Sequence, residues 1–294
     1  MRRLRSFALI AALVVGCSAA PSLSPTAAPT PAPTPTPAPT PTKPPSDVWL
    51  ETMLSAAEAS IEKGTVSLTF DAAFHGSISI PDGSGFSGTA VAAFGRPMRM
   101  AMDADLAVAN LGRIKIIVNA TDLYMNGAFI APLGITADQW LLVDLTSKDP
   151  RVVPFLGVTS GQNDMSLVMY YLYGLIAPVE RLDDVQLDGA LAQQFSASID
   201  LDRAAQMAPE DSRESLLDNI AVLRTQGAER TVASQVWVGD GLVRQVVYTY
   251  TLGAVSGGGT LRVLYSFDGY GDPLDLGIPK ESDIVRFEDI PTAT

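Results

Sequence analysis

The strongest constraint on the fold of this chain is a two-residue alternation of apolar and polar side chains. It is clear in residues 66–74 and 86–94, and it returns in residues 231–238, 242–252 and 260–267. Because successive side chains of a β-strand point to opposite faces, this period predicts strands with one buried and one solvated face. The short, turn-like connections between the segments indicate an antiparallel meander.

Five further segments are predicted to be strands: residues 98–106, 114–118, 123–125, 140–145 and 193–201. Helices are predicted at 47–63 and 210–225, where apolar residues recur every three or four positions, and in the apolar run 165–177. Gly64 is placed to end the first helix and Pro209 to begin the last. Runs of strands with helices interposed, in place of strict βαβ units, predict an α+β fold with a curved antiparallel sheet.

The N-terminus has the layout of an export signal. Arg2, Arg3 and Arg5 precede the apolar residues 7–15, and small residues crowd the far end of that run. The run is much shorter than the roughly 20 residues that a membrane-spanning helix needs. Residues 1–16 are therefore predicted to be a signal peptide that is removed after export.

Residues 14–17 resemble the lipobox of bacterial lipoproteins, in which the cysteine receives a diacylglyceryl group and becomes the new N-terminus. Cys17 is the only cysteine of the chain, so no internal disulfide can form, and acylation accounts for a lone exported thiol. Acyl chains on Cys17, at about 0.8 kcal/mol per buried methylene, would hold the protein on a membrane surface. The alternative is an ordinary secretory signal with an incidental cysteine.

Residues 18–46 consist almost entirely of proline, threonine, alanine and serine. Such a composition cannot bury a core, and alternating prolines favour an extended polyproline helix. Residues 17–46 are predicted to be a lipidated, disordered tether, and residues 47–294 a single folded domain held outside the cytoplasmic membrane.

The charge balance is strongly acidic. The predicted signal peptide contains three of the 20 basic residues and none of the 32 acidic ones, so its removal takes the net charge from −12 to −15. Such a charge repels nucleic acid and anionic lipid head groups at long range, which argues against a nucleic-acid partner.

Three segments resemble motifs of the LppX/LprG-type (LppX_LprAFG) lipoproteins of the bacterial cell envelope. Residues 124–127 with 140–145 are similar to the central hairpin of that family, residues 236–244 to its late hairpin, and residues 267–273 to its closing strand and turn. The resemblance implies a fold like that of the LolA and LolB carriers, with a half-barrel sheet wrapped over helices around an apolar cavity. It also implies the carriage of a lipid or lipoglycan across the envelope. We expect a lipid or another apolar small molecule as the ligand and an envelope transporter as a further partner.

The residues of the strands also leave room for an apolar ligand. In residues 86–94 the inward row places small side chains between two aromatic ones, and the methionines of the following strand are adaptable apolar surface. The alternative is that helices pack closely on the small residues and methionine fills gaps in a solid core. The cavity candidates on these strands are Phe70, Phe86, Ala90, Ala92, Phe94, Met98, Met100 and Met102.

The apolar run 165–177 is apolar on nearly every side, so the predicted helix is buried or faces a ligand or membrane. It is too short to span a bilayer. A buried core helix and a cavity-lining helix or mobile lid are the two interpretations. On the second one, Val168, Met169, Leu172 and Ile176 are cavity candidates.

The sequence carries no signature of an enzyme. His75 is the only histidine, so a catalytic triad or a histidine metal site has no partners. The acidic pairs lack the spacing of a calcium loop, and the glycines at 257–259 are followed by neither a helix nor a lysine. We therefore expect no catalytic residue, metal or cofactor.

Together these patterns predict a non-enzymatic, membrane-anchored envelope lipoprotein. It would bind an apolar ligand, with lipid acyl chains as the first choice, between the sheet and the helices, and carry or present it. The alternative is a structural or interaction lipoprotein with a filled core that docks an envelope partner. A small-molecule sensor is a third interpretation.

Overall fold

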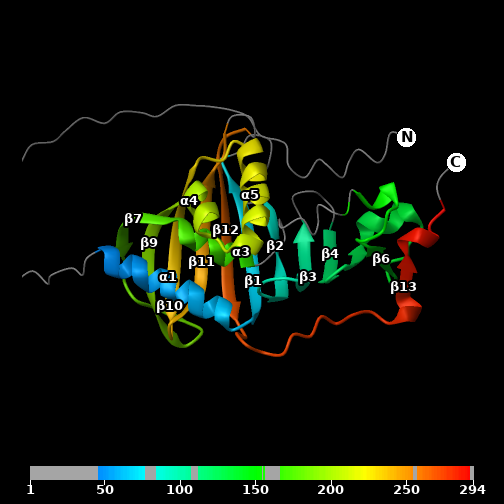
Figure 1. The fold of residues 1–294 in the computed structure, drawn as a ribbon, viewed down its shortest axis with the longest axis horizontal. Helices are drawn as coiled ribbons and strands as arrows, with labels where there is room; N and C mark the ends of the chain where they lie inside the picture. Colours follow the sequence, from blue (N-terminus) through cyan, green and yellow to red (C-terminus); the bar gives the residue numbers. More distant parts are fainter. Residues whose placement is uncertain are drawn as a thin grey trace, which may run out of the picture.

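In the computed structural model the described residues are 46–76, 84–106, 112–153, 155, 166–253 and 257–291. In this part of the chain 13 strands form one open, curved sheet, and α-helices lie against one of its faces (Figure 1). The α+β class and the curved sheet expected from the alternation are confirmed. We call the face toward the helices the inner face and the opposite one the outer face.

The sheet follows the meander that the short connections predicted. Its order is β13-β6-β5-β4-β3-β2-β1-β12-β11-β10-β9-β7, with β8 paired to β9. All neighbouring strands are antiparallel except β13, which runs parallel to β6. The strands are β1 (Thr65–His75), β2 (Gly85–Ala93), β3 (Arg99–Leu106), β4 (Gly112–Asn119), β5 (Asp122–Gly127), β6 (Trp140–Asp144), β7 (Leu175–Arg181), β8 (Val185–Leu187), β9 (Ala190–Asp200), β10 (Thr231–Gly239), β11 (Leu242–Thr251), β12 (Thr260–Asp268) and β13 (Ile284–Arg286).

The α-helices are α1 (Ser46–Glu62), α3 (Ser166–Tyr170), α4 (Leu201–Met207) and α5 (Glu210–Thr225). The short 3-10 helices are η3 (Ala128–Leu133), η4 (Pro150–Val152), η5 (Tyr171–Gly174), η7 (Glu281–Asp283) and η8 (Phe287–Asp289). As expected, α1 ends at a glycine: Gly64 takes a positive φ of 80°, a conformation that costs glycine little. None of the described helices combines the length and the apolar character needed to cross a bilayer.

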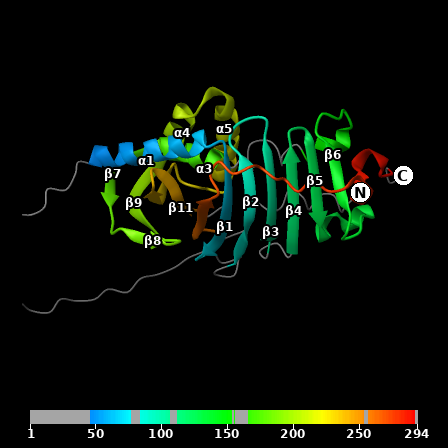
Figure 2. The same ribbon diagram turned by 90° about the horizontal axis from the view of Figure 1, so that it is seen from below.

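The α-helices cover only one part of the sheet. α1 packs on β7, β10 and β11, α4 packs on β9, and α3 lies between α1 and α5. Figure 2 shows β3 to β6 continuing well beyond these helices. We call β7 and β9–β12 the helix-covered region and β2–β6 the extended region, with β1 between them.

The inner face is apolar across both regions, and its rows follow from the strand register. One row runs from Leu68 through Ala90, Met102, Ile116 and Met125 to Leu141, each residue paired with the next across neighbouring strands. The alternation of the sequence thus places every second side chain of six strands on one continuous apolar surface.

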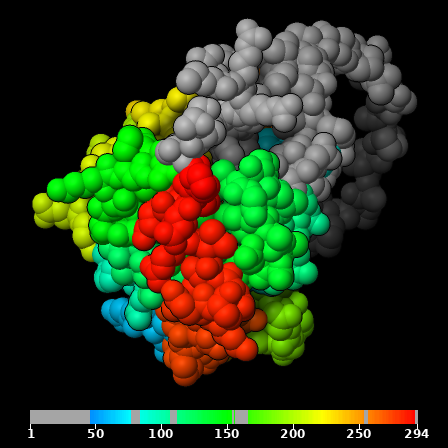
Figure 3. Space-filling view, turned by 90° about the vertical axis from the view of Figure 1, so that its right-hand side faces the viewer, coloured from blue at the N-terminus to red at the C-terminus, as the bar shows by residue number. Residues whose placement is uncertain are grey.

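The chain after β12 crosses to the far edge of the sheet along the ends of the strands (Figures 1 and 2). Leu276 and Ile284 of this segment pack on the outer face against Ile117, Tyr124 and Leu142. At the far end of the molecule the C-terminal residues form a red band flanked by green mid-chain residues (Figure 3). β13 thereby pairs with β6, which would otherwise be an edge strand.

One predicted helix is wrong in its extent. The run 165–177 was expected to be a single helix, but α3 ends at Tyr170, η5 follows, and Leu175 and Ile176 already pair with β9. Gly174 is the last residue of η5, and a Cβ atom there would lie 2.4 Å from the Asp200 carbonyl oxygen, so the close approach of the two backbone segments requires glycine at this position. A fully apolar run cannot separate helix from strand by its period alone.

Candidate functional site

The structure gathers most of the predicted cavity residues on the inner face. In the main hydrophobic core are Phe70, Ala90, Ala92, Met98, Met100, Val168, Met169 and Leu172. Phe86, Phe94 and Met102 pack against that core while keeping part of their surface accessible. Ile176 does not join them, because it belongs to β7 and only its neighbour Leu175 enters the core. Cys17 lies outside the described residues.

The row of small residues on β2 is not open along its whole length. The ring of Phe70 lies over Gly88, with one ring carbon 2.8 Å from the position that a Cβ atom would take. The Phe70 and Phe86 rings are tilted against each other with centroids 6.3 Å apart. The space expected above Gly88 is therefore occupied by an aromatic ring of the protein, and Ala90 and Ala92 are buried.

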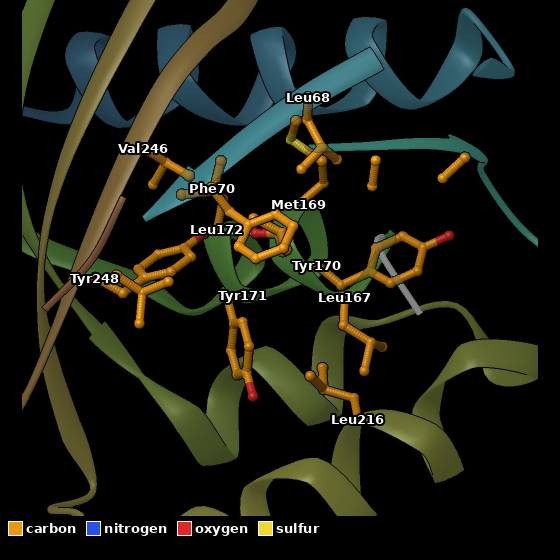
Figure 4. Close-up of a cluster of buried hydrophobic side chains, with 14 of the residues drawn as sticks. Leu68, Phe70, Leu167, Met169, Tyr170, Tyr171, Leu172, Leu216, Val246 and Tyr248 are labelled. Carbon is orange, nitrogen blue, oxygen red and sulfur yellow. Dashed lines mark hydrogen bonds between the residues drawn. The ribbon is translucent and has the colours of Figure 1, made fainter. Parts of the chain in front are cut away.

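The short helix α3 is a core helix. All five of its residues are buried, and Met169 and the following Leu172 are fully enclosed. Figure 4 shows the side chains of α3 and η5 lying between Leu68 and Phe70 on the sheet and Leu216 on α5. Of the two interpretations of this segment, the buried helix is the one that the structure displays.

Part of the inner face remains accessible at one end of the strands. Phe74, Phe86, Leu106 and Leu261 all pack on the main core but are only partly buried. They lie where β1 and β3 end and where β2 and β12 begin, on four strands that are neighbours in the sheet. We call these four residues the accessible corner. It is an apolar surface that the described part of the protein leaves incompletely covered.

Four tyrosines form a cluster between the sheet and η5. The Tyr248 ring has its centroid 5.7 Å from that of Tyr171, 6.3 Å from that of Tyr250 and 6.4 Å from that of Tyr265. Burial raises the pKa of Tyr265 to about 12. Burial also raises the pKa values of the other three above their usual range, and for these three the neighbouring tyrosines add to the shift. All four side chains therefore stay protonated and neutral near pH 7.

Two of these hydroxyls have protein partners. The Tyr248 hydroxyl donates a hydrogen bond of 2.5 Å to the carbonyl oxygen of Val168, which fastens α3 to β11. The Tyr171 hydroxyl bonds to Oδ1 of Asn219 on α5. These contacts tie the helices to one another and to the sheet.

A separate pocket of about 430 Å³ lies on the outer face, beneath Leu276 and Gly277 of the crossing segment. Outward-facing residues such as Thr89, Ala101 and Lys115 line this pocket. Ala90 and Met102, which neighbour these residues along the strands, also border it. It lies across the sheet from the helices, and its lining is mixed in polarity. It is therefore distinct from the apolar surface that the sequence predicted.

Among the described residues, the charged side chains lie on the surface of the protein. Their buried polar side chains are all serines, and they include no group of histidine, cysteine or acidic side chains suited to a metal ion. Asp200 shows how the carboxylates are used: it caps α4 and pairs with Arg230, whose hydrogen bonds lower the pKa of that carboxyl group. This is a structural role at a helix end.

Sequence reasoning marked Phe86 but missed the other three residues of the accessible corner and two tyrosines, Tyr250 and Tyr265. The alternation did carry a signal for both, since it placed Tyr248 and Tyr250 on one face of a predicted strand and Phe74 at the end of another. Which strands become neighbours cannot be read from a local period, however, so the meeting of these residues was not predicted.

Solved structures similar to this chain include two mycobacterial lipoproteins. LppX from Mycobacterium tuberculosis is 12% identical with a TM-score of 0.44, over 78% of this chain and 98% of LppX. LprF from Mycobacterium bovis is 12% identical with a TM-score of 0.46, over 79% of this chain and 97% of LprF. A putative outer membrane lipoprotein-sorting protein domain from Vibrio parahaemolyticus is 7% identical with a TM-score of 0.26, over 78% and 96%. No protein-family model and no curated protein matches the sequence.

Proposed function

We propose that this protein is a membrane-anchored envelope lipoprotein that binds an apolar ligand on the inner face of its sheet and carries or presents it. Lipid acyl chains are the ligand class that fits best. The observation that carries the proposal is an apolar inner face that stays partly accessible at Phe74, Phe86, Leu106 and Leu261. Apolar surface left uncovered inside a curved sheet is suited to a chain-like apolar ligand.

The apolar row behind this corner is long enough to accommodate an acyl chain. From Leu68 on β1 to Leu141 on β6 it crosses six strands, which spans about 24 Å at the usual strand spacing. In this row Met102 keeps part of its surface accessible, and its flexible side chain can adapt to an irregular partner, while the other members of the row are buried. Each ligand methylene buried there would contribute about 0.8 kcal/mol to binding.

The membrane anchor is part of the same proposal. The lipobox-like residues 14–17 support cleavage before Cys17, acylation of Cys17 and a tether over residues 17–46 that leads to the folded domain. α1 begins at Ser46, at the end of that tether. The Cys17→Ala variant should lose all radiolabelled fatty acid while the wild type keeps it. Equal labelling of the two proteins would reject the anchor.

The ligand site is tested by filling it. Ala90→Leu and Ala92→Leu add bulk to the inner face of β2, and the matched control Ala204→Leu adds the same bulk to α4, where the Ala204 side chain is fully buried beside Gly174. If ligand lies over β2, both β2 variants should retain less lipid per folded molecule in native mass spectrometry of protein from its own host. The control should lose about 1–3 kcal/mol of stability through overpacking and keep its lipid.

The outcome also separates this function from its rival. If the wild type carries no lipid and the β2 variants are destabilised as strongly as the control, the inner face is a filled core. The protein would then be a structural or docking lipoprotein. Lost lipid with preserved stability would place the ligand on β2.

A further inference from the structure

Two hydroxyl groups of the tyrosine cluster lack partners in the described structure. Tyr250 is 94% buried, with a relative exposure of 6%, and Tyr265 lies beside it on the next strand. Among the described residues, neither hydroxyl has a hydrogen-bond partner, in contrast to those of Tyr171 and Tyr248. Both side chains belong to the inner face, where Tyr250 is part of the main core and Tyr265 packs against it.

A buried hydroxyl without a partner is costly. Leaving such a donor unpaired costs about 1–3 kcal/mol, which applies to the buried Tyr250, whereas Tyr265 keeps part of its surface accessible. Burial and the neighbouring tyrosines raise the pKa of Tyr250, so the group remains a neutral donor. Bound water or a polar group of a ligand would remove the cost.

The position of the pair favours a ligand. Tyr265 is paired in register with Phe70, whose ring packs on Phe86 of the accessible corner. Tyr250 is paired with Leu261, which itself belongs to that corner. A molecule that entered over the accessible corner would therefore first contact the apolar side chains of the corner and then reach the two hydroxyls.

The surroundings restrict the charge of that ligand group. In the described part of the protein no lysine, arginine or histidine is buried, and the buried polar side chains are serines. A carboxylate or phosphate seated against the tyrosines would be desolvated without a counter-ion, which is strongly unfavourable. A neutral carbonyl needs only donors, and the tyrosines are donors.

We infer that Tyr250 and Tyr265 form a polar anchor that donates hydrogen bonds to a neutral acceptor, such as the ester carbonyl of a lipid whose chains lie on the inner face. This deepens the proposed function and rests on it. The anchor would fix the depth and direction of an acyl ester, while the apolar row takes its chains. It would also select acyl esters over bare hydrocarbons of the same length.

The test removes the hydroxyls and keeps the rings, in the full-length delipidated protein. Affinities for dioleoylglycerol and for octadecene are measured by displacement of a fluorescent probe, for the wild type and the double variant Tyr250→Phe, Tyr265→Phe. Dioleoylglycerol should bind about tenfold more weakly to the double variant, as expected for the loss of two ordinary hydrogen bonds, while octadecene affinity stays the same. Without ligand, the double variant should be at least as stable as the wild type.

Tyr248→Phe is the matched control, because its hydroxyl is already bonded to Val168. It should lower thermal stability without changing the ratio of the two affinities. An unchanged dioleoylglycerol affinity in the double variant would assign the hydroxyls to bound water and overturn the anchor, with the proposed function intact. An equal loss for both ligands would overturn it as well. If the wild type bound neither molecule, the proposed function would fall and the anchor with it.

Discussion

The two regions of the sheet carry the same alternation of side chains but are finished differently. In the helix-covered region, polar contacts fasten the helices to the strands. Ser60 of α1 accepts a 3.0 Å hydrogen bond from the Val243 amide of β11, and Tyr248 of β11 bonds to the carbonyl oxygen of Val168 in α3. In the extended region the α-helices do not form such a layer. Met102 stays partly accessible there, while most other inner-face residues, such as Met100 and Met125, are buried.

This difference indicates that the alternation of side chains determines the sheet. The size of the inner-face residues and their polar contacts determine whether a region is closed by helices or left partly accessible. Ser60 is fully buried, and its hydroxyl also donates a 2.7 Å hydrogen bond to the Ala56 carbonyl oxygen. The hydroxyl therefore acts as both a donor and an acceptor. Such satisfied buried groups fix one arrangement. Alanine and methionine on the extended region fix much less, which suits a surface that must accept a variable partner.

The largest effect that separates the regions is expected from a matched pair of phenylalanines. Phe195 on β9 is fully enclosed, whereas Phe86 on β2 keeps part of its surface accessible. Phe195→Ala should lower the free energy of unfolding by about 3–5 kcal/mol, because it opens a cavity in a closed core. Phe86→Ala should cost about 1–2 kcal/mol, since less apolar surface returns to water. Urea denaturation of the delipidated proteins measures both values.

The same two variants can also contradict the proposed difference between the regions. Equal losses for the two variants would mean that the extended region is as tightly packed as the helix-covered one. Lipid-loaded protein sharpens the result: added lipid should widen the gap between wild type and the Phe86 variant and leave the Phe195 difference unchanged, because only Phe86 borders the proposed ligand surface.

Much of this division was predictable from sequence, for physical reasons. Strands with clean alternation were placed within a few residues, and the predicted helix 210–225 is α5. The single helix predicted for 165–177 was wrong because Leu175 and Ile176 pair with β9, and that pairing joins segments that a local pattern cannot relate. The site was half predicted: local pattern marked Phe86 and Met102 as inward, but the meeting of Tyr250 with Leu261 depends on strand order.

The crossing segment was also missed, because residues 269–283 show no period that a local pattern could reveal. β13 has only three residues, and its pairing with β6 joins the C-terminal part of the chain to mid-chain residues. A contact of this kind is set by packing on the outer face, where Leu276 joins the cluster of Ile117, Tyr124 and Leu142.

The smallest expected effect tests whether that segment supports the extended region alone. Leu276→Ala removes part of a partly buried contact, so global stability should fall by no more than about 1 kcal/mol. Because β13 and β6 depend on the segment for cover, their backbone amides should exchange with solvent faster, whereas those of β9 and β10 should keep their rates. Hydrogen exchange followed by mass spectrometry measures both regions at once. Ile278→Ala is the control, since that side chain is 48% exposed in the same segment and should change neither region. Faster exchange in β9 would show that the two regions open together. The sheet would then be one cooperative unit, and the two regions would not differ in local stability.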